Sequence, residues 1–150
     1  MRRFDFTISF FIMLFPKKVK HRKWQKHRRN LSKIGVASRG TTIAFGSWGL
    51  RATSYGRIRS TQIEAARRVL SRGVAKSGRV WIRIFPDRPY TAKPPEVGMG
   101  KGKGDPQGFE VEVLPGRILF EIDGLAREAA IDTLRKAGSK MPVKTRAVSA

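Results

Sequence analysis

Apolar and polar positions alternate with a period of two in three places along the chain. The clearest case is RVWIRIF at residues 79–85, and this alternation is typical of a strand with one buried face. Residues 109–113 and 118–122 alternate in the same way. Between them, LPGR at residues 114–117 has proline and glycine at the positions that a type II turn prefers. We therefore expect residues 109–122 to fold as an antiparallel hairpin.

A period near 3.6 predicts a helix over residues 62–76 that ends near Gly78. Thr61 and Glu64 have the spacing of a capping box, in which each side chain accepts a hydrogen bond from the other residue's backbone N–H. The apolar residues recur at helical spacing, which predicts one buried face. This apolar stripe consists of Ile63, Ala66, Leu70, Gly73 and Val74.

A second helix is expected over residues 125–137. Asp123 is placed to cap its start, and Gly138 follows its last residue, where glycine commonly ends a helix. Residues 141–148 either add a last strand or trail as a tail. The second half of the chain therefore predicts strands followed by a helix rather than a regular strand–helix alternation.

Residues 41–51 mix strand-forming side chains with glycine and predict one or two short strands. Ile43, Phe45 and Leu50 are the core candidates there. With the elements above, they predict a compact α+β domain that has a mainly antiparallel sheet and two helices. At 150 residues the chain is long enough for one domain with a modest core.

Four glycines alternate with other residues at the centre of an irregular segment that we place at residues 93–108. Glycine loses the most freedom on ordering and offers no side chain to a core, so this segment cannot hold the domain together. Its backbone N–H groups and lysines suit an anion such as phosphate. We expect it to protrude as a loop. Its central residues are Met99, Gly100, Lys101, Gly102, Lys103 and Gly104.

The charge of the chain is strongly positive: 32 Lys and Arg oppose 11 Asp and Glu, a net charge of +21. Such a surface repels itself and favours a polyanionic partner, which predicts nucleic acid. Between Phe6 and Ile63 the sequence contains no carboxylate. The chain has no cysteine, which excludes disulfides and thiolate metal sites.

A block at residues 17–29 is the most basic part of the sequence. Such an arm is unfolded alone and orders on a polyanion, although a solvated, disordered tail is the alternative. Trp24 could stack on a base, and His21 and His27 add polar contacts. The predicted RNA contacts of the arm are Lys17, Lys18, Lys20, Arg22, Lys23, Trp24, Lys26, Arg28 and Arg29.

Two further groups of cations are predicted to contact RNA from the folded body. One surrounds Tyr55-Gly56, and the other covers the polar face of the first helix, where a single carboxylate is too few to neutralise the cations. The first group comprises Arg51, Arg57 and Arg59, and the second comprises Arg67, Arg68, Arg72 and Lys76.

Patterns for catalysis and cofactor binding are missing from the sequence. The glycine run matches neither the phosphate-binding loop G-x-x-x-x-G-K-[ST] nor the dinucleotide pattern G-x-G-x-x-G. Glu110 and Glu112 share one strand face, where we expect them to neutralise nearby cations. We find no nucleophile with a base and no metal cluster, so we expect a binding protein without enzyme activity, cofactor or small-molecule substrate.

Residues 1–12 precede Met13, and we interpret them as an extension outside the fold. The apolar run from Phe6 to Phe15 is too short to span a membrane, and no small-residue cleavage site follows it. We divide the remainder into a basic RNA-binding arm at residues 13–40 and one domain at residues 41–150. Two alternatives stay open: a general nucleic-acid-binding protein or RNA chaperone, and a cationic membrane-active or secreted protein.

Several motifs in this order resemble those of the bacterial large-subunit ribosomal protein sixteen (uL-sixteen) family. They are FPKKVKHRKWQK, FGSWGLRA, IEAARR, VWIRIFPDRPYTAKP, MGKGKG, LPGRILFEIDG and MPVKT, and the resemblance runs from Met13 to Val148. Family members often have an arginine before MGKGKG that an oxygenase hydroxylates in some bacteria. Gly98 occupies that position here, so the resemblance does not extend to that modification site.

The resemblance implies a hammerhead-like α+β domain that acts in the cytoplasm as part of the ribosome. It implies binding to 23S rRNA beside the A site and the peptidyl-transferase region, contacts with neighbouring large-subunit proteins, and a role late in subunit assembly. The loop from Met99 to Gly104 would face A-site tRNA, with P-site tRNA as an open alternative. The arm and body cations would lie on rRNA.

Overall fold

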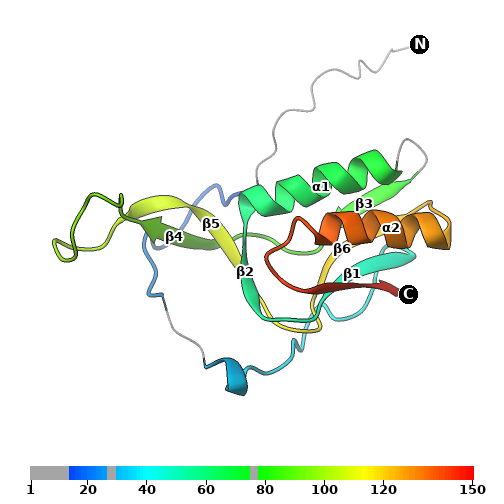
Figure 1. Ribbon diagram of the computed structural model, residues 1–150, viewed down its shortest axis with the longest axis horizontal. Coiled ribbons are helices and arrows are strands. Elements are labelled where there is room, and N and C mark those ends of the chain that lie inside the picture. The colour runs from blue at the N-terminus through cyan, green and yellow to red at the C-terminus, as the bar shows by residue number, and fades with distance from the viewer. Residues whose placement is uncertain (1–13, 27–29, 75–77) are drawn as a thin grey trace, which may run out of the picture.

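The computed structural model describes residues 14–26, 30–74 and 78–150 (Figure 1). In these residues the chain forms two α-helices and seven strands, and every strand pairing is antiparallel. The predicted α+β class is therefore confirmed. The elements are η1 (Leu31–Lys33), a 3₁₀ turn, then β1 (Trp48–Ala52), β2 (Gly56–Arg59), α1 (Ser60–Val74), β3 (Arg79–Ile82), β4 (Arg88–Ala92), β5 (Asp105–Val113), β6 (Ile118–Asp123), α2 (Arg127–Gly138) and β7 (Thr145–Ser149).

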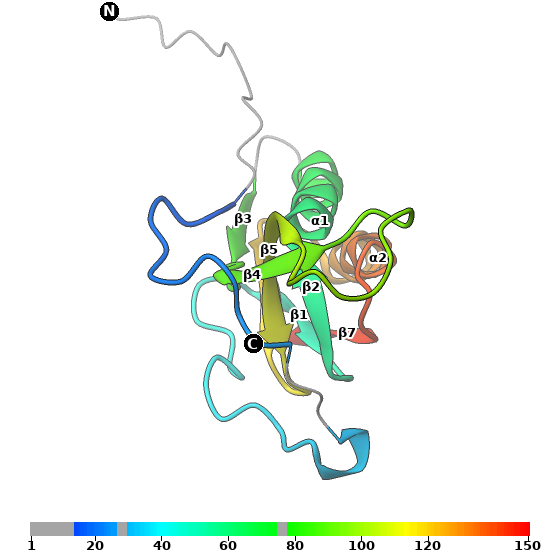
Figure 2. The ribbon, with the colours of Figure 1, turned by 90° about the vertical axis from the view of Figure 1, so that its left-hand side faces the viewer.

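The strands form two sheets, one with the order β3-β6-β1-β7 and one with the order β2-β5-β4. Both helices lie on the same face of the four-stranded sheet (Figure 2). The core lies between them and includes Leu50, Leu70, Phe120 and Leu134, which are all fully buried. Of the predicted helix stripe, Ile63, Ala66, Leu70 and Val74 are buried. The four-stranded sheet and its helices thus form the body, and the three-stranded sheet extends from it toward a loop.

The hairpin predicted for residues 109–122 is wrong. β5 pairs with β2 and β4, whereas β6 pairs with β1 and β3. The turn itself forms, because Gly116 has a φ of +96° and the Arg117 N–H donates to Leu114 O over 3.3 Å. β6 is buried along almost its whole length and therefore needs a strand on each side. Those two places are taken by β1 and β3, so the turn carries the chain from one sheet to the other.

The predicted capping box at Thr61 and Glu64 is also wrong. α1 begins at Ser60, two residues earlier than predicted, and the Arg59 N–H donates to Gln62 Oε1 over 2.9 Å. Gln62 therefore has the role that the sequence pattern assigned to Glu64. Glu64 is buried on the helix and accepts hydrogen bonds from two arginines instead.

The second helix starts later than predicted, and Asp123 does not cap it. Asp123 is the last residue of β6 and accepts a hydrogen bond from the Ser47 hydroxyl, which lowers the pKa of this carboxyl. Ala126 precedes the helix without a side-chain cap. Gly138 is the last helical residue rather than the residue after it, and Ser139 follows in right-handed helical conformation.

Two strands were not predicted, and one irregular segment is shorter than predicted. β2 and β4 are short, and β4 contains a proline that an edge strand tolerates. Because β5 already begins at Asp105, the irregular segment covers residues 93–104 and not 93–108. One strand, β1, forms near residues 41–51, and residues 141–148 contribute the start of β7.

Residues 40–47 cross the sheet face that the helices leave uncovered. Ile43 lies over Gly49 of β1, where a Cβ would come within 3.1 Å of the Ile43 side chain. The Glu121 carboxylate, fully buried, accepts backbone N–H groups of Ala44, Phe45 and Gly46. This anchorage turns the Phe45 ring outward, so the expectation that Phe45 is in the core is wrong: the residue is 61% exposed.

Candidate nucleic-acid interface

The basic arm does not leave the body but runs along β4 and the loop that follows it (Figure 1). Arg88 donates to the backbone O of Gln25 over 2.7 Å, and its guanidinium lies 5.8 Å from the Trp24 ring centre. Lys23 donates to Lys103 O over 3.1 Å, and Lys103 donates to Trp24 O. These contacts hold the backbone of the arm beside the loop.

Most cationic side chains of the arm are open to solvent although its backbone is held, whereas the Lys23 side chain also binds Lys103 O and lies 3.6 Å from Asp105 Oδ1. Trp24 is 41% exposed, so one part of its ring is open to a stacking partner. All six described cations of the block at residues 17–29 are exposed. They are Lys17, Lys18, Lys20, Arg22, Lys23 and Lys26, whereas Arg28 and Arg29 lie outside the described residues, as does His27.

The loop at residues 93–104 joins β4 to β5 and projects beyond the three-stranded sheet (Figure 1). Its tip has three successive residues with positive φ: Gly100 at +95°, Lys101 at +53° and Gly102 at +86°. Lys93 donates to Gly100 O across the base of this turn. Met99 is completely exposed, and Lys101 is exposed beside it. The tip therefore presents a sulfur side chain and a cation on a defined backbone.

The two glutamates of β5, Glu110 and Glu112, neutralise cations, as predicted. Glu112 accepts from Arg88 over 3.0 Å and from the Tyr55 hydroxyl over 3.0 Å. Glu110 lies 3.6 Å from Arg57 and 3.7 Å from Arg88. Burial, followed by the Glu112 hydrogen bond, raises the pKa of Tyr55, which keeps its hydroxyl protonated as a donor. This network fixes Arg88 and, through it, the arm.

The predicted body cations do not form one patch. Arg57 and Arg59 lie on β2, where the Arg57 side chain is 17% exposed and the Arg59 guanidinium covers the Tyr90 ring at 4.8 Å. Arg51 lies on β1, on the face opposite the helices, since its neighbour Leu50 contacts α2. The α1 cations lie on the other side of the sheet. The structure thus brings the arm together with the loop and separates the body cations among three places.

On α1, Arg67 and Arg68 share Glu64 and are only partly available to another anion. Arg67 Nε donates to Glu64 Oε2 over 2.7 Å, and this hydrogen bond is the main cause of the lowered pKa of Glu64. The Arg68 side chain donates over 3.1 Å and is 44% exposed. Arg72 is exposed one turn later, and Lys76 lies outside the described residues.

Sequence reasoning missed Arg88, Arg83 and Glu121, which organise the surface. Arg88 belongs to PDRP, which reads as a turn, and its role depends on carboxylates more than 20 residues later in the chain. Glu121 occupies a polar position in the alternating pattern of its strand, which predicts exposure. It is buried because residues 40–47 cross over it. A lone acid inside an apolar strand is the signal that could have indicated a buried anchor.

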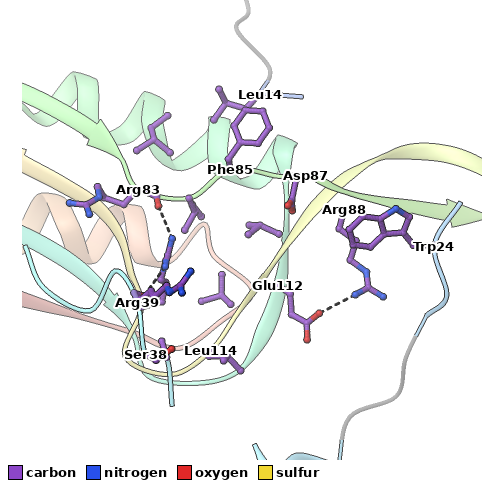
Figure 3. Close-up of a pocket in the computed structure, with 16 residues that line it drawn as sticks. Leu14, Trp24, Ser38, Arg39, Arg83, Phe85, Asp87, Arg88, Glu112 and Leu114 are labelled. Carbon is purple, nitrogen blue, oxygen red and sulfur yellow. Dashed lines mark hydrogen bonds and ion pairs between the residues drawn. The ribbon is translucent and has the colours of Figure 1, made fainter. Parts of the chain in front are cut away.

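A cavity of about 680 Å³ lies where the arm meets both sheets (Figure 3). Leu14 of the arm, Phe85 of the β3–β4 connection and Val111 of β5 contribute apolar walls. Arg117 closes one end by donating to Arg39 O over 2.7 Å. Nowhere in the described ranges do three or more His, Cys, Asp or Glu side chains gather in a way that could hold a metal ion. Among the same residues, no helix is long and apolar enough to cross a bilayer.

The sequence also matches known proteins. Residues 16–148 match the family model described as "Ribosomal protein L16p/L10e". The chain is 50% identical over 137 residues to the protein named "Large ribosomal subunit protein uL16" of Verminephrobacter eiseniae (strain EF01-2), an alignment that covers 91% of this chain and 96% of that protein. A protein of the bacterial large subunit acts in the cytoplasm as a structural, RNA-binding component of the ribosome. The chain therefore belongs to the L16p/L10e family of ribosomal proteins and is a bacterial member of it.

Proposed function

We propose that this chain binds 23S rRNA beside the A site and the peptidyl-transferase region, and supports late assembly of the large subunit. The observation that carries this proposal is the arm, whose backbone is held by Arg88 and Lys103 while Lys17, Lys18, Lys20, Arg22 and Lys26 are exposed. Because part of the arm backbone is already ordered, less conformational entropy is lost when its cations bind phosphates, which suits a folded RNA. Lys17, Lys18 and Lys20 are the arm contacts that we assign first.

We further assign the tip of the 93–104 loop to A-site tRNA, with P-site tRNA as a second candidate. The loop shares hydrogen bonds with the arm at its base, but Met99 and Lys101 at its tip face solvent. Lys101 and Lys103 therefore differ in role, because Lys103 also holds the arm.

The first test is sedimentation of a cell lysate through a sucrose gradient after a high-salt wash. The wild-type chain should travel with the large subunit. A second measurement is the affinity for salt-washed subunit cores as a function of salt concentration. For a triple variant with Lys17→Gln, Lys18→Gln and Lys20→Gln, the slope of log affinity against log salt should be smaller by about 0.9 for each lost phosphate contact. A chain that stays at the top of the gradient, or that binds random duplex as tightly as 23S rRNA, would favour a general nucleic-acid-binding protein.

The second test separates the loop from the arm. Lys101→Ala should leave incorporation unchanged and weaken tRNA binding at the A site of reconstituted subunits. Lys103→Ala should affect both, because it also removes the contact with Trp24 O. Loss of incorporation in the Lys101→Ala variant would contradict the assignment of the tip to tRNA.

A further inference from the structure

Phe45 forms a stacked group with two side chains of the β3 region. Its ring centre lies 6.2 Å from that of Trp81, with 20° between the planes, and the Arg83 guanidinium lies 4.8 Å from the Phe45 ring centre. Trp81 and Arg83 are two residues apart on an extended segment, so their side chains project from the same face. Both therefore pack against the Phe45 ring from the β3 region.

Much of Phe45 remains open to solvent. The residue is 61% exposed even though two side chains pack against it. Its backbone is fixed, because the Phe45 N–H donates to Glu121 Oε2 over 2.7 Å and the Gly46 N–H donates to the same oxygen over 3.1 Å. A ring held in this way loses little freedom when a flat partner stacks on it.

Two arginines on the same face of the sheet also indicate what kind of partner covers it. Arg51 of β1 lies directly opposite Arg146 of β7 in the strand register, and both alternate with residues of the helix-covered face. Like charges directly opposite each other are unfavourable unless an anion lies between them. The acid at the centre of this face, Glu121, is fully buried and already binds Arg83.

We propose that Phe45 is a stacking site for an unpaired nucleobase of ribosomal RNA, and that Arg51 and Arg146, which lie on the same face of the sheet, contact phosphates of the same RNA. Every base has a flat face that can stack on an aromatic ring, so the site selects unpaired bases and not a sequence. An aromatic protein side chain could also stack there, but the opposed arginines favour a polyanion. The inference rests on the proposed function, since it requires the chain to be in the ribosome.

The direct test is ultraviolet crosslinking of intact large subunits followed by trypsin and mass spectrometry. Trypsin cleaves after Arg39 and Arg51, so Phe45 lies in the peptide of residues 40–51. We expect a nucleotide adduct on Phe45 within this peptide. A peptide without adduct, an adduct on Trp48 alone, or a crosslink to another protein at Phe45 would overturn the inference.

The second test compares Phe45→Tyr with Phe45→Leu. Leucine keeps the apolar packing on Trp81 but has no aromatic face, so its affinity for salt-washed subunit cores should fall about 5-fold to 100-fold. Tyrosine should bind within about two-fold of the wild type. Phe85→Leu is the matched control, because Phe85 is 46% exposed on the cavity wall, and it should bind like the wild type.

The outcomes separate this inference from the proposed function. If wild-type chain sediments with the large subunit but Phe45→Leu binds as tightly as Phe45→Tyr, the stacking site is wrong and the ribosomal role stands. If Phe85→Leu weakens binding as much as Phe45→Leu, the effect is not specific to this site and the inference fails. If the wild-type chain is absent from the large subunit, both proposals fail. Thermal unfolding of each variant separates loss of contact from loss of fold.

Discussion

The carboxylate of Glu121 and the guanidinium of Arg83 form an ion pair beneath residues 40–47, and no part of the Glu121 side chain reaches solvent. The same carboxylate accepts three backbone N–H groups from the crossing segment. A buried acid of this kind joins β3, β6 and the segment that carries Phe45. Its removal leaves an unpaired guanidinium and unpaired backbone donors.

We therefore expect Glu121→Gln to lower the free energy of unfolding by about 3 kcal/mol, measured by chemical denaturation. Hydrogen exchange at the Phe45 and Gly46 amides should become faster than at other amides of the body. Glu128→Gln, on the exposed face of α2, is the control and should change stability by less than about 0.5 kcal/mol. Equal stability of the two variants would contradict the anchoring role.

The contact between Gly138 of α2 and Thr145 of β7 gives a second prediction. A Cβ at position 138 would overlap Thr145 Oγ1, whereas Thr145 Cβ lies at 3.7 Å, an ordinary contact distance. Gly138→Ala should therefore destabilise the protein by about 1–3 kcal/mol, although alanine favours helix by about 1 kcal/mol. In a Thr145→Ala background the same change should be neutral or stabilising. A double-mutant cycle with no coupling would show that the helix end shifts instead.

The glycines of the loop give a third prediction because two of them differ only in backbone conformation. Neither Gly98 nor Gly100 has an atom near the position of a Cβ, but Gly100 has a φ of +95°. Gly98→Ala should leave A-site tRNA binding unchanged. Gly100→Ala should strain the tip by about 1–2 kcal/mol and weaken that binding while thermal unfolding stays the same. Identical tRNA binding in the two variants would mean that the tip conformation has no role.

A fourth prediction concerns the acid dependence of stability at Glu64. The Arg67 hydrogen bond lowers the pKa of Glu64 in the folded protein below its ordinary value of 4.5. The unfolded chain therefore binds this proton first as the pH falls, and the contribution of Glu64 to stability is present above pH 4.5 and lost below it. Glu64→Gln should be less stable than the wild type by about 1 kcal/mol at pH 7, and the difference should shrink below that pKa.

The control for Glu64 is Asp132→Asn. Asp132 pairs with Lys136 at 2.7 Å and the same spacing of four residues, but both side chains are more than half exposed. Its removal should cost less than about 0.5 kcal/mol at pH 7. A stability difference for Glu64→Gln that does not change between pH 7 and pH 3 would show that the effect comes from packing and not from charge.

Local pattern was sufficient to predict the helices and most strands of this chain. Four of the five residues in the α1 stripe are buried as their spacing predicts, Gly73 being exposed, and LPGR forms the turn that its proline and glycine favour. The partners of those strands could not be predicted, because pairing depends on which strand is buried on both faces. β6 is such a strand, and only the assembled sheet shows that its two sides are already occupied.

Composition predicted that the chain has a nucleic-acid interface, but not which contacts arrange the arm and the loop. A run of cations without acids indicates a polyanion, yet it does not show that Arg88 fixes the arm or that Lys103 binds Trp24 O. Phe45 was placed in the core because apolar residues near a strand usually are. Phe45 is exposed instead, because its backbone N–H is anchored on the buried Glu121 carboxylate. The sequence does not show that residues 40–47 lie over β6, so this contact could not be predicted from it.

The turn at residues 114–117 leaves β5 and β6 without a shared sheet. As a result, the three-stranded sheet that carries the loop shares no strand with the four-stranded sheet of the body. Residues can be inserted into or deleted from the loop without shifting the register of the four-stranded sheet. Changes in the length of this tip, and engineered tags placed there, should therefore leave the fold intact. Their effects should appear only in the function of the ribosome.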